Sequence, residues 1–153
     1  MRDHTATKVI AADPDDVFRL LAEPGRLPDW NRKIVRLVEA PEPLTTGSQW
    51  VVELSALGQS WLSRSTVVAL DATKRRFAYR TQTDDGNPSY ADWTWQVADA
   101  ADGCTVTVTL GLHPVTFWRR VLLAKVRSRQ LRRQELPESL DALAALVATV
   151  PHP

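Results

Sequence analysis

Residues 102–110 read Asp-Gly-Cys-Thr-Val-Thr-Val-Thr-Leu, and this stretch does most to decide the fold. Val106, Val108 and Leu110 alternate with threonines, which is the pattern of an antiparallel strand with one buried and one exposed face. Asp102 and Gly103, just before the strand, predict the turn of a hairpin. The sheet is therefore expected to continue upstream of this turn.

The residues before the turn predict further strands with the same period of two. Trp50, Val52 and Leu54 share one face of a strand over residues 49–56. Turn-forming residues separate the remaining strands from one another. The seven predicted strands cover residues 6–12, 34–39, 49–56, 60–70, 75–83, 89–98 and 105–110.

Helices are predicted on both sides of the long run of strands. Asp13 and Pro14 predict a helix start, with the aspartate as N-cap and the proline at the first helical position. Residues 26–31 fit a second short helical turn. Residues 116–150 predict a long C-terminal helix, in which Pro137 marks a kink or a fresh start because it removes a helical hydrogen bond.

The composition is that of an ordinary globular domain. The chain has 153 residues, of which 44% are hydrophobic and 24% are charged, and its net charge is +1. We therefore expect one domain over residues 1–153, with a core of about residues 5–150. The near-neutral charge gives no attraction to nucleic acid, and no such partner is expected.

The sequence carries no signal for a cofactor or for export. The single cysteine, Cys104, excludes an intrachain disulfide, and His4, His113 and His152 lack the spacing of a metal site. No phosphate-binding glycine loop or nucleotide fingerprint is found, so neither a metal nor a cofactor is expected. Without a secretory signal or a membrane-spanning apolar run, the sequence predicts a cytoplasmic protein.

The order of the elements and four short motifs resemble the SRPBCC superfamily of START-related helix-grip proteins. The motifs are ADPDDVF (12–18), PDW (28–30), DGCTVT (102–107) and LPESLDAL (136–143). The resemblance spans nearly the whole chain and is greatest to bacterial polyketide cyclase/dehydrase-like members. It implies an α+β helix-grip fold, in which a curved seven-stranded antiparallel sheet wraps around a long C-terminal helix and two short helices follow the first strand. It also implies an apolar cavity between sheet and helix that takes lipids, polyketides, hormones or other hydrophobic molecules.

Six tryptophans are the most distinctive candidates for a ligand site. Strand alternation puts three of the six on the apolar face of the sheet, where core packing explains any one of them equally well. Trp61 shares that face with Ser63 and Ser65 if its strand keeps its register, whereas a bulge would turn both serines outward. The residues expected to line the ligand cavity are Trp30, Trp50, Leu54, Trp61, Ser63, Ser65, Tyr79, Thr81, Trp93, Trp95 and Trp118.

Groups that could move protons are few. His113 ends the last strand and would titrate near neutrality, although an exposed surface position explains it as well. Tyr79, Ser63 and Ser65 are the other candidate catalytic residues, and no nucleophile motif accompanies them. We therefore expect the chain to bind a hydrophobic small molecule that is aromatic, polyketide-like or lipid-like. The alternative is a polyketide cyclase, aromatase or dehydratase that uses the same cavity.

A basic segment supports a third hypothesis. Residues 116–136 contain seven arginines and lysines but only one acidic residue, Glu135. A solvated helix face explains such a segment, and so does attraction to an acidic protein, an anionic membrane surface or an anionic ligand. The third hypothesis is therefore a regulatory interaction protein that docks through this segment, with an acidic protein or a second copy of the chain as its partner.

Overall fold

The computed structural model describes residues 4–30, 34–41, 44–56, 58–83, 90–113 and 136–149. Within these ranges, seven antiparallel strands form one sheet in the order β1-β7-β6-β5-β4-β3-β2. From β2 to β7 each strand pairs with the next one in sequence, and β1 pairs with β7. The strands are β1 (His4–Ile10), β2 (Ile34–Glu39), β3 (Gln49–Ala56), β4 (Gln59–Asp71), β5 (Arg76–Thr83), β6 (Tyr90–Ala100) and β7 (Gly103–His113).

The predicted strands are confirmed, with shifts at some of their ends. β2 and β3 have the predicted bounds. β7 is longer than the predicted 105–110, because its pairing with β6 runs from the turn at Gly103 to His113. β1 lies two residues earlier than predicted, because the Ala12 N–H already bonds back to the Ile10 carbonyl in the turn that leads to the first helix.

The alternation in β7 defines two faces of the sheet. Val106, Val108 and Leu110 are fully buried, whereas the threonines between them are partly exposed on the other side. On that side the hydroxyls of Thr5 and Thr109 lie 3.5 Å apart, as the pairing of β1 with β7 requires. The apolar side is called the inner face below, and the threonine side is called the outer face.

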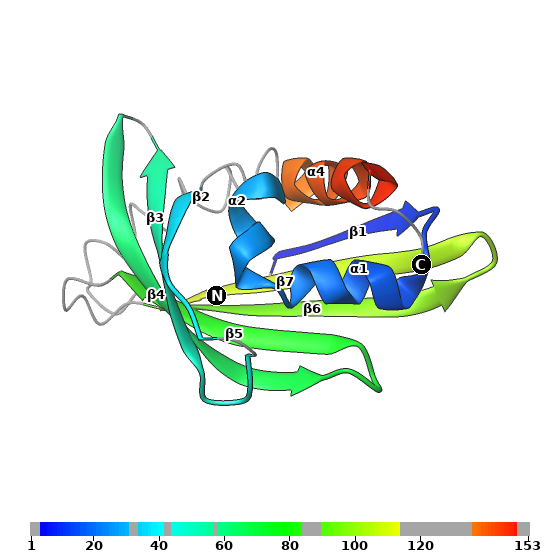
Figure 1. Cartoon of the computed structure of the whole chain (residues 1–153), viewed down its shortest axis with the longest axis horizontal. Coiled ribbons are helices and arrows are strands. Elements are labelled where there is room, and N and C mark those ends of the chain that lie inside the picture. The colour runs from blue at the N-terminus through cyan, green and yellow to red at the C-terminus, as the bar shows by residue number, and fades with distance from the viewer. Residues whose placement is uncertain are drawn as a thin grey trace.

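The described helices all lie over the inner face, as Figure 1 shows. They are α1 (Pro14–Leu21), the 3-10 turn η1 (Pro24–Arg26), α2 (Leu27–Trp30) and α4 (Leu136–Thr149). Asp13 caps α1 as predicted, because its Oδ1 accepts a hydrogen bond of 2.8 Å from the Asp15 N–H. α1 packs on β6 and β7, α2 packs on β2, and α4 packs on β1.

The C-terminal part of the fold is described from α4 onward. α4 begins at Leu136 and has Pro137 in its first turn, at the point where a kink or a fresh start is predicted. Residues 116–135, which carry the rest of the predicted long helix, lie outside the described residues. The arrangement is an α+β helix-grip fold, an open antiparallel sheet that holds a C-terminal helix against its inner face. None of the described helices has the length and apolar character needed to cross a membrane.

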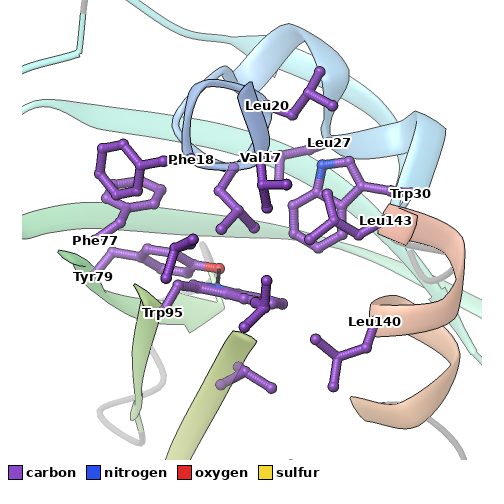
Figure 2. Packing of buried hydrophobic residues seen from close by; sticks show 14 of the residues in the cluster. Val17, Phe18, Leu20, Leu27, Trp30, Phe77, Tyr79, Trp95, Leu140 and Leu143 are labelled. Atoms are coloured by element: carbon purple, nitrogen blue, oxygen red, sulfur yellow. Dashed lines mark hydrogen bonds between the residues drawn. The ribbon is translucent and has the colours of Figure 1, made fainter. Parts of the chain in front are cut away.

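One end of the inner face is filled by side chains from both layers. Figure 2 shows residues of α1, α2 and α4 packed in one buried cluster with the aromatic rings of Phe77, Tyr79 and Trp95. An ion pair between Lys8 Nζ of β1 and Asp141 Oδ1 of α4, 2.8 Å apart, joins α4 to this end of the sheet. The labelled helix residues are Val17, Phe18, Leu20, Leu27, Trp30, Leu140 and Leu143.

Two backbone positions hold the turns at this end. Gly103 has φ +147°, and a Cβ at this position would collide with the carbonyl oxygen of Ile10 and with the backbone that follows it. Arg75 has φ +50°, and its Nε donates to Asp15 of α1 at 2.8 Å. Its Nη1 donates to Asp99 of β6 at 3.3 Å. The hydrogen bond to Asp15 raises the pKa of Arg75 and ties the β4–β5 turn to the start of α1.

Candidate functional site on the inner face

The strand register arranges the inner face in rows that run across the sheet. Each residue in a row is the direct cross-strand partner of the next. One row crosses β3, β4, β5, β6 and β7 and consists of Trp50, Ser65, Thr81, Ala91 and Leu112. The adjacent row consists of Val67, Tyr79, Trp93 and Leu110.

β4 keeps its register over the two serines. Trp61 is the direct partner of Leu54, and the register shift of β4 lies between Val67 and Ala69, beyond the serines. Ser63 and Ser65 therefore lie on the inner face with Trp61, where they are only 5% and 2% exposed. β4 does have a bulge, but it lies after Val67 and therefore does not change the face on which the serines lie.

The aromatic residues of the inner face contact one another in a continuous series. Trp50 meets Tyr79 edge-on, with ring centroids 4.8 Å apart, and Tyr79 stacks on Trp93 at 6.1 Å. Trp93 stacks on Trp95 at 6.5 Å, and Trp95 meets Trp30 of α2 edge-on at 5.2 Å. The edge-on contacts have a geometry that aromatic pairs prefer.

Tyr79 and Trp95 form a buried polar pair within this series. The Trp95 indole N–H donates to the Tyr79 hydroxyl oxygen at 3.0 Å (Figure 2). Burial raises the pKa of Tyr79 far above its ordinary value, against the opposing effect of the Trp95 hydrogen bond. Tyr79 is therefore a neutral hydrogen-bonding group at physiological pH and not a base. The Trp30 N–H is also buried, and no hydrogen-bond partner for it is found among the described residues.

Exposure divides the inner face into two halves. The packed half consists of residues that are at most 2% exposed, namely Phe77, Trp95, Val97, Cys104, Val106 and Val108. The hydroxyl half consists of Trp50, Val52, Leu54, Trp61, Ser63, Ser65, Thr81, Ala91 and Leu112. Five of these remain partly exposed, namely Leu54, Trp61, Thr81, Ala91 and Leu112. Tyr79 and Trp93 lie at the boundary, where Tyr79 is buried and Trp93 is partly exposed.

The described hydroxyl half carries no charged side chain, and the charged inner-facing position Asp99, the partner of Cys104 near the far end of β6, is exposed and pairs with Arg75. The hydroxyl half contains only indole, aliphatic and hydroxyl side chains, and the packed half contains rings, aliphatic side chains and a thiol. The thiol is that of Cys104, whose pKa is raised by burial, so it stays protonated. The described residues contain no group of three or more His, Cys, Asp or Glu side chains that could hold a metal ion.

The structure places His113 away from the other candidate catalytic residues. His113 is exposed on the outer face, where its ring stacks on Tyr90 at 4.7 Å and its Nε2 lies 3.5 Å from Asp92 Oδ2. Arg80 donates two hydrogen bonds to the same carboxylate, at 2.8 and 3.2 Å, and lies 3.9 Å above the Tyr90 ring. Tyr79, Ser63 and Ser65 instead share the inner face, without His113.

Two further positions complete the account of the candidate residues. Trp118 and the basic segment up to residue 135 lie outside the described residues. His4, which the sequence analysis weighed only as a metal ligand, is buried at 7% exposure and pairs with Leu110, the partner of Trp93. Its alternation with Thr5 and Thr7 was the signal that could have placed it on the inner face.

Comparison with known proteins identifies relatives of the whole chain. The sequence profile of a family described as polyketide cyclase/dehydrase and lipid transport matches residues 1–148. No curated protein gives a significant match to the sequence.

Solved structures share the fold at low sequence identity. Protein TTHA0849 of Thermus thermophilus is 20% identical, with a TM-score of 0.76 over 97% of this chain and 100% of that one. The di-domain ARO/CYC protein StfQ of the steffimycin biosynthetic pathway is 15% identical, with a TM-score of 0.75 over 95% of this chain and 50% of that one. Norcoclaurine synthase of Thalictrum flavum, in complex with a transition-state analogue, is 16% identical, with a TM-score of 0.70 over 96% of this chain and 94% of that one.

Proposed function

Because this chain belongs to the polyketide cyclase/dehydrase and lipid transport family, we propose that it binds a hydrophobic small molecule in the hydroxyl half of the inner face. The observation that carries the proposal is the partial exposure of inner-facing aromatic rings. Trp61 and Trp93 point to the apolar side of the sheet and are still partly exposed. Large apolar side chains that face inward without full burial offer surface that a ligand can cover.

The two rings differ in how they meet the rest of the protein. Trp93 stacks on Tyr79 and Trp95 and packs against the buried core, so its position is well supported. Trp61 is not among the side chains that pack against the described part of that core. Trp61 lies three inner-facing positions from Val67, the β4 residue in the row of Trp93, so the two rings are well separated along the strands. A flat ligand that stacks on Trp93 would bury the exposed area of that ring, which supports an aromatic or polycyclic guest.

The chemistry of the inner face supports binding more than catalysis. Tyr79 stays protonated because burial raises its pKa, so it does not accept a proton at neutral pH. The serine hydroxyls have no inner-facing partner on β3 to β7 that would activate them as nucleophiles. His113, the imidazole among the candidates, lies on the outer face. The Tyr79 and serine hydroxyls of the inner face can orient a bound ligand through hydrogen bonds.

A titration with a neutral fluorescent probe tests this proposal. N-phenyl-1-naphthylamine should bind the wild-type protein saturably, with the rise in emission that follows transfer to an apolar site. Trp93→Ala should weaken the affinity about tenfold, since it removes a stacking surface. Val68→Ala is the matched control, because Val68 is a 58% exposed apolar side chain on β4. Native mass spectrometry of freshly purified protein would identify the chemical class of a retained ligand.

Two outcomes would contradict the proposal. Emission that rises linearly without saturation in the wild type would mean that no apolar site exists. Saturable binding that Trp93→Ala leaves unchanged, with circular dichroism showing that the variant is folded, would place the site elsewhere in the molecule.

A further inference from the structure

Three hydroxyl side chains lie together in the otherwise apolar hydroxyl half. Ser65 and Thr81 are direct cross-strand partners, and Ser63 lies two residues from Ser65 on the same face of β4. Trp50 is the partner of Ser65 on the other side, and Trp61 precedes Ser63 on the same face. The register therefore encloses the hydroxyls between indole rings of β3, β4 and β6.

The hydrogen-bonding capacity of this group is largely unused. The Ser63 and Ser65 side chains are 5% and 2% exposed, and no hydrogen bond of either hydroxyl is found among the described residues. Thr81 Oγ1 donates to the Ala91 carbonyl, but at the long distance of 3.5 Å. Buried hydroxyls normally find partners, and each can both donate and accept. A ligand oxygen would supply the missing partner.

The surroundings of the hydroxyls favour an uncharged ligand. No described inner-facing position of β3 to β7 carries a charge that could pair with a carboxylate or a phosphate. An ionised group placed there would lose its hydration without gaining a counter-charge from these strands. The hydroxyl or carbonyl oxygen of a neutral molecule needs no such partner.

We propose that Ser63, Ser65 and Thr81 form a subsite for the hydroxyl or carbonyl oxygen of an uncharged aromatic ligand whose rings lie against Trp93, which is next to the Thr81–Ala91 row on β6. This inference rests on the proposed function and specifies its ligand class. It makes the hydroxyl half selective for phenolic or ketonic ring systems over carboxylated ones of the same size.

Three probes that share one ring system test the inference by calorimetry. They are 2-naphthol, 2-methylnaphthalene and 2-naphthoate, which differ in a single substituent, and the last is ionised at pH 7. We expect 2-naphthol to bind the wild type about fivefold more tightly than 2-methylnaphthalene, the size of one net hydrogen bond. We expect 2-naphthoate to bind at least tenfold more weakly than 2-naphthol.

Variants of the hydroxyls separate this subsite from binding in general. The double variant Ser63→Ala/Ser65→Ala should remove the advantage of 2-naphthol and leave the affinity for 2-methylnaphthalene unchanged. Ser60→Ala is the matched control, because Ser60 is an exposed serine on the same strand with the opposite parity. Thr81→Val, which keeps the side-chain shape, should reduce the advantage and provides a second test if the double variant fails to fold.

The possible failures are distinguishable. Equal binding of 2-naphthol and 2-methylnaphthalene, or an advantage that survives both hydroxyl variants, would overturn the subsite and leave the proposed function standing. Tightest binding by 2-naphthoate would overturn the preference for uncharged ligands. If none of the three probes and no N-phenyl-1-naphthylamine bound, the proposed function would fail with the inference.

Discussion

Trp93 and Trp95 lie two residues apart on β6 and point to the same face of the sheet, yet their surroundings differ. Trp95 is 1% exposed, donates its N–H to Tyr79 and meets Trp30 of α2 edge-on. Trp93 stacks on the same neighbours, Tyr79 and Trp95, but remains partly exposed. One ring is held on every side, whereas the other keeps surface that a second molecule can cover.

The position of the described helices accounts for this difference. α1 packs on β6 and β7, and α4 packs on β1 and contacts α1 and α2, so apolar side chains meet over the packed half. The hydroxyl half lies one row further along the strands, toward the Ser65–Thr81 pair. The packed half therefore carries most of the stability of the fold, and the hydroxyl half carries the proposed binding.

Truncation of the two tryptophans tests this division most directly. Trp95→Ala should lower the free energy of unfolding by about 3–5 kcal/mol, because it opens a cavity in a fully packed region. Trp93→Ala should lower the free energy of unfolding clearly less than Trp95→Ala, because the Trp93 ring is already partly exposed. It should weaken ligand binding more than Trp95→Ala does. Urea unfolding measures both losses. Equal losses in the two variants would mean that the inner face is packed uniformly and that the division is wrong.

The two hairpins at opposite ends of the strands give the next largest contrast. Gly103→Ala should cost about 1–3 kcal/mol or more, because the new methyl group meets the Ile10 carbonyl oxygen and the backbone must shift. Gly58→Ala, in the β3–β4 hairpin, meets no atom within 4 Å and bears only the strain of its φ of +74°. Thermal unfolding should therefore rank Gly58→Ala as the more stable variant. The reverse order would show that contact with β1 does not constrain the Gly103 turn.

Sequence reasoning predicted most of the fold, because alternation reports directly on a half-buried sheet. The run at Val106, Val108 and Leu110 defined the inner face, and Asp13 defined the start of α1. The length of β7 was underestimated, since Gly111 and His113 continue the pairing without a strong apolar pattern. Pairing with a neighbour extends a strand beyond what its own residues predict.

The candidate site was less predictable than the fold. Parity placed Trp50, Trp93 and Trp95 on one face, and the structure has them there. Parity could not predict that Trp95 is buried while Trp93 stays partly exposed, because the exposure of each ring depends on which helix lies over its row. Parity also could not predict that the β4 bulge lies beyond Val67, a position that leaves the serines on the inner face. The position of a bulge depends on pairing with both neighbouring strands.

The Tyr79–Trp95 hydrogen bond provides a smaller test at the boundary of the halves. Tyr79→Phe removes the acceptor and leaves a buried indole N–H without its partner, which should cost about 1–3 kcal/mol of stability. Thr81→Val is the control from the hydroxyl half, because it removes only a long hydrogen bond of a partly exposed group. Urea unfolding should show a clearly larger loss for Tyr79→Phe. Equal losses would mean that the 3.0 Å bond contributes little.

The same tyrosine predicts a pH dependence. Burial raises the pKa of Tyr79, so the folded protein holds this proton more tightly than the unfolded chain, whose tyrosine has the ordinary pKa of 10.0. The resulting stabilisation is complete below about pH 10 and is lost as the pH rises further. The chain has two tyrosines, so Tyr90→Phe leaves Tyr79 as the single reporter. Its phenolate absorbance in the near ultraviolet should rise only when the protein unfolds. A rise near pH 10 in the folded state would contradict the burial of Tyr79.

The smallest expected effect is that of His113→Ala, and it tests the assignment of the two faces. His113 stacks on Tyr90 and faces Asp92, which Arg80 already binds with two hydrogen bonds, so the carboxylate keeps its partner in the variant. Exposed pairs of this kind contribute about 0–1 kcal/mol. Stability should therefore change little, and the affinity for N-phenyl-1-naphthylamine should not change, because the sheet separates His113 from the hydroxyl half. A loss of affinity comparable to that of Trp93→Ala would place the ligand within reach of the outer face and overturn the division drawn between Trp93 and Trp95.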